Sequence, residues 1–448
     1  MADKEMLLGL SLSEAYGLHP GAWRVAAREA YTDVDVFVQA AERAEQGGMD
    51  FLFVPDRVFL HEDLTYGPPF FTMDPLMVLS AVAYTTDCIG LVTSASTSFH
   101  EPYTIARQFR ALDVMSHGRA GWNAIPSYEP DAFANHGMPV PPREKKYERL
   151  HEAIQITQAL WGSWRREAGQ PDKTSGRFAD MRHIRPINLQ GNQVGSRGPL
   201  QIPPSEQGQP VIFMPFASGA SLDAAARYAD GVVAMPRTPD EGRQQVELMR
   251  SLVEQAGRDA DDVKVFPFMQ FSLGVTERDA IEHRMVLDRA AGVDDLVPQL
   301  AAVLGITIDD VDTPLSDAQI AALTPHPHSP RTTRIIELAT QGLTPREILA
   351  WGVISRGGFD SANPGMIGSP EQAADMIEEW MHAGAGDGLT VVLSDVQHDL
   401  PLFVEHVVPI LRQRGLRPEG YLGSTLRDHL GLKEQLGLDP RISSQDNA

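Results

Sequence analysis

The stretch "PYTIARQFRALDVMSHGRAGWNAIPS" (residues 102–127) joins a helical pattern to an apolar strand within a few residues. Its apolar side chains recur at helical spacing, at Ile105, Phe109, Leu112 and Met115. Gly118 then predicts a left-handed helix cap, because glycine adopts positive φ without steric cost. The residues "AGWNAIPS" (120–127) are expected to form a strand that carries Asn123 past its middle. A helix that leads directly into an apolar strand indicates an α/β architecture.

The same alternation of apolar strands and helical segments extends along the chain. The expected strands are 6–12, 51–56, 88–97, 120–127, 210–218, 231–236, 263–274 and 388–394. Helical patterns between them include 36–48, 102–118 and 143–164. Continuous apolar strands separated by helices indicate a parallel sheet covered on both faces. Eight such units favour a closed (β/α)8 TIM barrel over an open doubly wound sheet.

The chain is expected to be one barrel domain over residues 1–440, followed by a flexible tail at 441–448. A (β/α)8 barrel needs about 250 residues, and the surplus is predicted to lie in two insertions. These are at about 165–209 and about 290–368, where Gly and Pro interrupt the pattern. Either insertion is expected to act as a mobile lid over the open end of the barrel, or to be surface decoration or a subunit contact.

Composition limits the classes of partner. Lys and Arg total 38 against 60 Asp and Glu, a net charge of −22, which opposes binding to nucleic acid or an anionic membrane. Cys88 is the single cysteine, so an intrachain disulfide and a multi-cysteine metal site are excluded. The first residues do not resemble a secretion signal, and no apolar run approaches the ~18 residues of a membrane span. We therefore expect a soluble, cytoplasmic protein.

TIM barrels carry their active sites at the carboxyl ends of the strands. The residues near those ends are His19, Asp56, Thr93, Ser94, Asn123, Ser218, Gln270 and Ser394. This set is poorly suited to hydrolysis and better suited to holding an organic cofactor that supplies the chemistry. No Rossmann or P-loop glycine motif occurs, and the histidines lack metal-ligand spacing, so no metal site is expected. Each polar residue also has a structural interpretation, because Asp and Ser often cap turns and helices.

Residues 89–127, "IGLVTSASTSFHEPYTIARQFRALDVMSHGRAGWNAIPS", resemble the core of the bacterial luciferase-like flavin monooxygenases. The resemblance is strongest to the branch with nitrilotriacetate monooxygenase component A and the EDTA, dibenzothiophene-sulfone and long-chain alkane monooxygenases. Further matching segments are "GLHPGAWR" (17–24), "KYERLHEAIQITQALWGSW" (146–164), "IGSPEQAADMIEEWMHAGAGDGLTVV" (367–392) and "YLGSTLRDHLGL" (421–432). The last segment has no general structural reason to recur, so it is the most specific of them.

The resemblance implies a site for reduced FMN (FMNH2). The residues assigned to this cofactor are Asp56, Thr93, Ser94 and Asn123 around the ring, and Arg143, Tyr147, Ser218 and Gly219 around the phosphate. His19 and Phe59 are assigned to the substrate side. Arg143 stands where the family commonly has a histidine, and Lys146 where it has an arginine. A catalytic role of that histidine therefore does not carry over, and no catalytic residue is assigned.

The resemblance also implies an activity. A separate NAD(P)H:flavin reductase would supply FMNH2, and this chain would use O2 through a flavin C4a-(hydro)peroxide to oxygenate a small organic substrate. A homodimer or homotetramer is expected. The dry cavity would be walled by Phe53, Phe59, Phe70, Phe71, Phe99 and Phe216. Three alternatives stay open: deazaflavin-dependent hydride transfer on the same fold, a non-catalytic flavin-binding relative, and a hydrolytic barrel.

Overall fold

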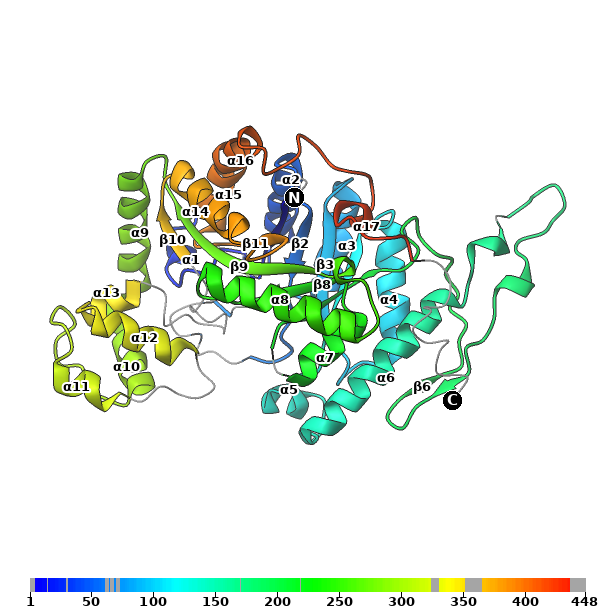
Figure 1. Cartoon of the computed structure of the whole chain (residues 1–448), viewed down its shortest axis with the longest axis horizontal. Helices are drawn as coiled ribbons and strands as arrows, with labels where there is room; N and C mark the ends of the chain where they lie inside the picture. The colour runs from blue at the N-terminus through cyan, green and yellow to red at the C-terminus, as the bar shows by residue number, and fades with distance from the viewer. Residues whose placement is uncertain are drawn as a thin grey trace.

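The computed structural model describes residues 5–13, 15–29, 31–60, 64, 68–69, 73–169, 171–217, 219–323, 330–350 and 365–435. Its main sheet has nine strands, and every pair within it is parallel. One strand, β10 (Gly365–Gly368), pairs only with β9, and the other eight close into a ring because β8 also pairs with β9. The predicted TIM barrel is confirmed (Figure 1).

The eight barrel strands lie within the predicted apolar segments. They are β1 (Leu7–Ser11), β2 (Phe51–Val54), β3 (Gly90–Ser96), β4 (Ala120–Ile125), β7 (Val211–Pro215), β8 (Gly231–Ala234), β9 (Lys264–Leu273) and β11 (Gly388–Leu393). Around them lie α2 (Val34–Gln46), α3 (Pro75–Thr85), α4 (Pro102–Met115), α6 (Arg143–Gly162), α7 (Gly219–Tyr228), α8 (Pro239–Gln255), α14 (Pro370–His382), α15 (Val396–Leu402) and α16 (Val408–Gln413). Side-chain caps start several of these helices, as at Asp74 and Ser369.

The junction of α4 and β4 has the predicted geometry. Gly118 adopts a φ of +86°, and its N–H donates to the Asp113 carbonyl at 2.8 Å, as in a glycine-capped helix end. Trp122 is fully buried between the barrel and its helices, with ring centroids 6.0 Å from Phe109 and 6.1 Å from Trp161. Successive side chains of a strand point to opposite faces, so Asn123 faces the barrel interior.

A short C-terminal helix, α17 (Leu426–His429), closes the amino-terminal end of the barrel. Leu426 is fully buried in an inner core that includes Phe51 and Phe213. A Cβ atom at Gly90 would meet Leu426 Cδ1 at 2.5 Å, so glycine is needed there for the helix to seat. Arg427 Nη2 also lies 3.1 Å from Asp230 Oδ2. The segment "YLGSTLRDHLGL" therefore has a structural role as a plug.

The first insertion forms an arm that projects from the barrel beyond α4 and α6 (Figure 1). It holds two short 3-10 helices and the two-stranded pair β5 (Leu189–Gln190) and β6 (Gly195–Ser196). Glu152 on α6 accepts N–H donors from Asn192, Gln193 and Val194 and so fixes the arm to the barrel flank. The arm returns at Gln207, whose Nε2 donates to the Ala120 carbonyl at the amino-terminal start of β4. These contacts place the described arm on the flank and at the amino-terminal end of the barrel, so a lid role for this segment stays a prediction without support from them.

The second insertion is a helical unit that follows the carboxyl end of β9. It comes after α9 (Glu277–Ala291), which packs on the main core through Leu287, and it comprises α10 (Val293–Leu304), α11 (Asp317–Ala322), α12 (Pro330–Thr340) and α13 (Pro345–Ala350). These four helices share a separate apolar core that includes Leu300, Ile335 and Leu338 (Figure 1). Residues 351–364 of this insertion lie outside the described residues. That this unit moves as a lid stays a prediction.

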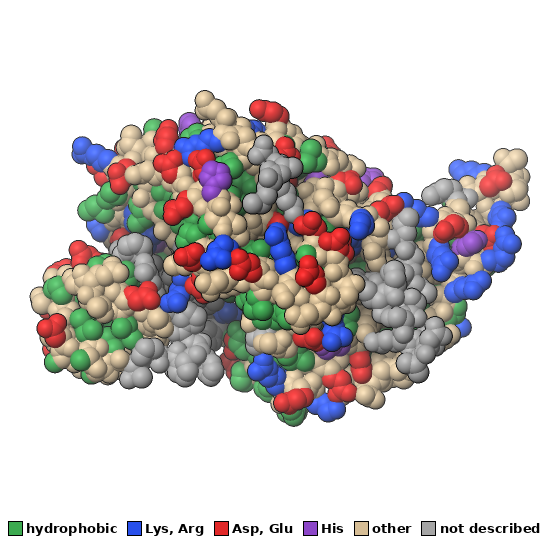
Figure 2. Space-filling view, viewed as in Figure 1, with side chains coloured by type: hydrophobic (Ala, Val, Ile, Leu, Met, Phe, Trp, Pro, Cys, Tyr) green, Lys and Arg blue, Asp and Glu red, His purple; other side chains and the backbone are tan. Residues whose placement is uncertain are grey.

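The surface agrees with the acidic composition. Acidic and basic side chains are interspersed over the face in Figure 2, and several basic ones lie close together on the projecting arm. On that arm Arg177 and Arg182 both pair with Asp180. Among the described helices, none has the length and hydropathy to cross a membrane.

Candidate functional site

A cavity of about 320 Å³ opens at the carboxyl ends of six barrel strands, from β2 round to β9. Phe53 and Phe268 lie at its base with ring centroids 5.8 Å apart. Ile125, Val233 and Met235 add apolar wall. Its volume lies in the range of small-molecule and cofactor sites, about 300–1,000 Å³. The predicted location of the site at the carboxyl ends agrees with this cavity.

The polar wall of the cavity is built by β3 and β4. Ser94 and Asn123 stand opposite each other in the strand register, and Asn123 Nδ2 donates to Ser94 Oγ at 2.8 Å. Asn123 Oδ1 is buried and has no hydrogen-bond partner within the described part of the chain. A buried amide oxygen without a partner costs about 1–3 kcal/mol, so a ligand that donates to it would recover that free energy.

Thr93 is not brought to the cavity. It is paired with Val54 and Trp122, whose side chains pack toward the helices, and it is fully buried on that side of β3. Strand alternation separates it from Ser94, its neighbour in sequence. Thr93 and Ser94 were both assigned to the flavin ring from the sequence. The structure places Ser94 on the cavity wall and Thr93 on the opposite face of β3.

Asp56 lines the cavity just after β2. Burial, and secondarily the charge of Asp74, raise the pKa of its carboxyl to about 6. A carboxyl group with a raised pKa in a cavity is typical of functional sites, because structure alone does not favour burying a charge there. Asp56 can hold a proton under mildly acidic conditions and lose it near neutrality.

The region assigned to a phosphate lies between α6 and α7. Tyr147 lines the cavity, and the Arg143 guanidinium lies 5.6 Å from the centroid of its ring. Gly219 begins α7, and a Cβ atom there would meet nothing within 4 Å, so the approach to the helix N-terminus is open. Ser218 lies outside the described residues. Helix N-termini favour anions through their free N–H groups and dipole.

His19 is placed away from the cavity. Its Nε2 lies 2.9 Å from Asp288 Oδ1 on α9, and its Nδ1 accepts the Gly21 N–H at 3.1 Å. Burial, and next the charge of Arg284, lower the pKa of this imidazole to about 4. Both ring nitrogens are engaged, so the neutral ring joins the loop after β1 to α9. A substrate role for His19 stays a prediction without support from this geometry.

The predicted aromatic walls are only partly on the cavity. Phe53 and Phe59 line it. Phe99 instead packs against Phe133 and stacks on His136, with centroids 4.9 Å and 4.0 Å away. Phe216 packs against the main core and is absent from the cavity lining. Phe70 and Phe71 lie outside the described residues.

Several lining residues were not predicted from the sequence. They are Arg57, Ser96, Ser127, Tyr128, Glu129 and Ser221. Ser127 Oγ donates to Ser96 Oγ at 2.8 Å, which extends the polar wall one layer beyond Asn123. The two-residue spacing from Ser94 to Ser96 could have indicated Ser96, because alternate residues share a face. Ser221 lies two residues beyond Gly219 on α7, and no sequence signal marked it.

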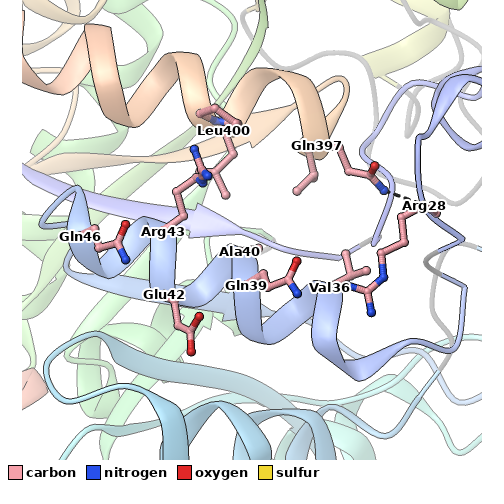
Figure 3. A pocket seen from close by; sticks show the side chains of 11 residues that line it. Arg28, Val36, Gln39, Ala40, Glu42, Arg43, Gln46, Gln397 and Leu400 are labelled. Carbon is pink, nitrogen blue, oxygen red and sulfur yellow. Dashed lines mark hydrogen bonds between the residues drawn. The ribbon is translucent and has the colours of Figure 1, made fainter.

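A second hollow, of about 490 Å³, lies on the outside of the barrel between α2 and α15 (Figure 3). Two of its polar side chains already have partners, since Arg43 pairs with Glu405 at 2.8 Å and Gln397 donates to the Arg28 carbonyl. It lies on the flank rather than at the strand ends, where TIM-barrel chemistry occurs. We therefore place the candidate active site at the first cavity.

The fold and the cavity define a TIM-barrel enzyme with a cofactor-sized site at the carboxyl ends of its strands. Residues 18–387 match the model of the luciferase-like monooxygenases. The chain belongs to this family, and it is a monooxygenase by class. The resemblance stated from the sequence is thereby confirmed.

Three similar proteins illustrate the family. Nitrilotriacetate monooxygenase component A of Aminobacter aminovorans is 32% identical, over 96% of this chain and 97% of that protein. EDTA monooxygenase from Chelativorans sp. BNC1 is 28% identical, with a TM-score of 0.78 over 97% of this chain and 100% of that one. Riboflavin lyase, solved with modified FMN and riboflavin, is 25% identical, with a TM-score of 0.78 over 98% of this chain and 99% of the other.

Proposed function

We propose that this chain is the oxygenase component of a two-component system, which uses reduced FMN and O2 to oxygenate a small organic substrate. The family and the riboflavin lyase solved with modified FMN support a flavin as the cofactor. The observation that carries the proposal is the buried, unpartnered Asn123 Oδ1 on the wall of a cofactor-sized cavity.

The residues present fit a flavin. An isoalloxazine is a flat ring system with one edge that carries an N–H donor between two carbonyl groups. Asn123 Oδ1 would accept that N–H, while Ser94 keeps the amide in one orientation. The aromatic and aliphatic side chains at the base, including Phe53 and Phe268, suit the ring faces. Such a fit would give a partner to a buried polar atom that has none within the described residues.

The phosphate would lie toward α7. The N-terminus at Gly219 offers backbone N–H groups without a side chain in the way. Arg143 would supply a cation in place of the histidine common in the family, and Tyr147 positions it by the ring contact. Ser218 is proposed to complete this turn. A charged hydrogen-bond partner of this kind contributes about 1.5–3 kcal/mol when shielded and less when exposed.

Reduced FMN, when bound, supplies the electrons with which O2 is activated. The protein's share is to bind and orient the flavin and the substrate, and to exclude water that would divert the reaction. Phe59, Met235 and Ile125 would line the dry part of the cavity. Asp56 stands on the same wall with a pKa of about 6, so it can hold or release one proton near the working pH.

The remaining parts of the proposal concern partners. A separate NAD(P)H:flavin reductase would deliver FMNH2 transiently, because the described chain contains no Rossmann-type motif of its own for a nicotinamide cofactor. We also propose a homodimer or homotetramer that works in the cytoplasm. The substrate is proposed only as a small organic molecule.

The test is a reconstituted reaction with isotopically labelled O2. A generic flavin reductase with NADH supplies FMNH2 to the purified chain, in the presence of a panel of amines, sulfones, thioethers and alkanes. The expected result is a product that gains one labelled oxygen atom only when both proteins, FMN and O2 are present. Hydride transfer without O2 uptake, seen with a deazaflavin in place of FMN, would overturn the proposal.

A further inference from the structure

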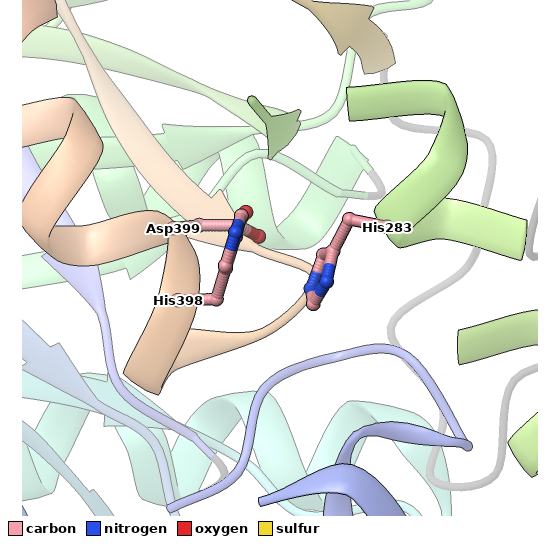
Figure 4. Close-up of side chains that lie close together, drawn as sticks. All are labelled: His283, His398 and Asp399. Atoms are coloured by element: carbon pink, nitrogen blue, oxygen red, sulfur yellow. The ribbon is translucent and has the colours of Figure 1, made fainter. Parts of the chain in front are cut away.

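A cluster of two histidines and an aspartate lies outside the cavity, where α9 meets α15. His283 comes from α9, and His398 and Asp399 come from the start of α15 (Figure 4). Their potential ligand atoms all lie within 4.8 Å of one another. The spacing of 115 residues between the two histidines, from 283 to 398, explains why sequence patterns indicated no metal site.

The contacts within this cluster leave a buried imidazole nitrogen, His283 Nε2, without a hydrogen bond among the described residues. The two rings stack with centroids 3.7 Å apart and planes 15° from parallel. His283 Nε2 is buried 3.3 Å from Asp395 Oδ2, yet it forms no hydrogen bond within the described residues. This nitrogen lies near a carboxylate but forms no hydrogen bond with it, so the nitrogen has neither a donor nor an acceptor as its partner.

The separations match those between two ligands of one ion. Tetrahedral Zn²⁺ with ligands at ~2.0–2.1 Å places adjacent ligand atoms about 3.3 Å apart. His398 Nδ1 and Asp399 Oδ1 are 3.1 Å apart, and His283 Nε2 and Asp395 Oδ2 are 3.3 Å apart. An ion would take the place of the proton that His398 Nδ1 now shares with Asp399. The two stacked rings hold their nitrogen lone pairs in nearly parallel planes, so binding one ion requires at least one imidazole to turn about its Cβ–Cγ bond.

We propose that His283, His398 and Asp399 bind one divalent transition-metal ion, with Asp395 as a fourth ligand or hydrogen-bond partner. Two imidazoles and a carboxylate select Zn²⁺, Co²⁺ or Ni²⁺ over Mg²⁺ and Ca²⁺, which prefer sets made of oxygen atoms. Asp399 is held for this purpose by N–H donors from Leu273 and Asp395. Such outer hydrogen bonds orient metal-binding carboxylates.

The ion would fasten the second insertion to the barrel. His283 belongs to α9, which leads into the helical unit of residues 293–350, whereas Asp399 joins α15 to the end of β9. The existing links from α9 to the barrel include the His19–Asp288 contact, the donation from Arg24 Nη1 to the Ala290 carbonyl, and the burial of Leu287 in the main core. A metal bridge at His283 would add a further point of attachment and limit rotation of α9 against the barrel.

The experiment titrates metal-stripped full-length protein with Zn²⁺ in competition with a chromophoric chelator, near neutral pH. The expected result is one Zn²⁺ per chain, and at least tenfold weaker binding in both His283→Ala and His398→Ala. Co²⁺ should give the intense visible bands of a four-coordinate site. The matched control is His117→Ala, which removes an exposed histidine paired with Glu206 at 3.1 Å and should leave binding unchanged.

Folding of the variants is checked independently. Circular dichroism and urea unfolding report whether each alanine variant is native, and the Co²⁺ spectrum of the unmodified protein needs no variant at all. Zn²⁺ should also slow hydrogen exchange in residues 277–291 of the unmodified protein and not in folded His283→Ala. Absence of stoichiometric binding, octahedral Co²⁺ bands, or an equal loss in His117→Ala would overturn the proposal.

Discussion

Asn123 donates through its Nδ2 to Ser94 Oγ at 2.8 Å across the β3–β4 pair, and this contact fixes the orientation of its amide. The opposite atom, Oδ1, is thereby left as a buried acceptor without a partner in the described chain. The two residues act as one unit, in which Ser94 orients the amide and Asn123 presents the acceptor. The proposed flavin site depends on this relationship.

Ser94→Ala should therefore weaken FMNH2 binding even if Ser94 does not touch the cofactor. The amide of Asn123 loses its only fixed partner, and about 0.5–1.5 kcal/mol of binding free energy is expected to be lost with it. Anaerobic fluorescence titration measures the change. Thr93→Val is the control, because Thr93 lies on the opposite face of the same strand. Equal effects of the two substitutions would show that β3 is merely perturbed.

Asp56→Asn should stabilise the fold at neutral pH. The pKa of Asp56 is raised from 3.8 to about 6, so the folded chain binds more protons than the unfolded chain between these values. Stability is consequently lost as pH rises through that window, and the charged group is unfavourable above it. Two pKa units correspond to about 3 kcal/mol, and partial exposure reduces our expectation to about 1–2 kcal/mol.

Urea unfolding at pH 4 and pH 7.5 measures this difference. The variant and the unmodified protein should differ much less near pH 4, where Asp56 is protonated in the folded chain and about half protonated in the unfolded chain. Most of the gain should appear at the higher pH. A gain of equal size at both values would mean that the asparagine makes new contacts and that the carboxyl charge is irrelevant.

Arg143→Ala should reduce affinity for FMN but not for riboflavin, which lacks the phosphate. Arg143 is exposed and held near Tyr147, so we expect a loss of about 0.2–1 kcal/mol, the range for partly screened charges. The loss should shrink at high salt. Lys145→Ala on the same helix turn is the control, since Lys145 pairs with Glu148 at 2.7 Å. An equal loss of affinity for FMN and riboflavin would show that Arg143 stabilises α6 and does not contact the phosphate.

Leu426→Ala should destabilise the barrel while leaving the flavin site intact. Leu426 is fully buried at the amino-terminal end, between the glycines of β3 and β4. Truncation of such a leucine costs about 2–5 kcal/mol through lost transfer free energy and a residual cavity. Urea unfolding should show this loss, and the folded variant should bind FMNH2 normally. If the folded variant also lost flavin affinity, the prediction that the plug and the flavin site are independent would be wrong.

The fold could be predicted from the sequence because the spacing of apolar residues along the chain indicates which side chains are buried. The barrel strands are buried on both faces, so each gives a largely apolar run such as 388–394, where β11 (Gly388–Leu393) is fully buried. The order of such runs then limits the topology to a closed barrel. The helical core of residues 293–350 was not predicted as a unit, since its elements are short and connect through Gly and Pro.

The site could be predicted only in part. Positions at strand ends, such as Asp56 and Asn123, are fixed by strand length and therefore appeared in the sequence. Which of two adjacent residues faces inward depends on the register, and this is why Thr93 and Ser94 were assigned together. The position of the arm depends on tertiary contacts, such as the hydrogen bond from Gln207 to Ala120, and these cannot be predicted from a local sequence pattern. Contacts between distant helices, such as His283 with His398, have the same limitation.

The central claim is that Asn123 Oδ1 receives a hydrogen bond from reduced FMN in this cavity. The most direct measurement is anaerobic titration of FMNH2 into the unmodified protein, Asn123→Leu and Thr93→Val. Asn123→Leu removes a buried acceptor that has no partner within the described residues. Urea unfolding should therefore show that the variant is still folded. We predict FMNH2 affinity lower by about 1–3 kcal/mol, roughly fivefold to over a hundredfold in Kd, with no change in Thr93→Val. Unchanged affinity in folded Asn123→Leu would contradict the account.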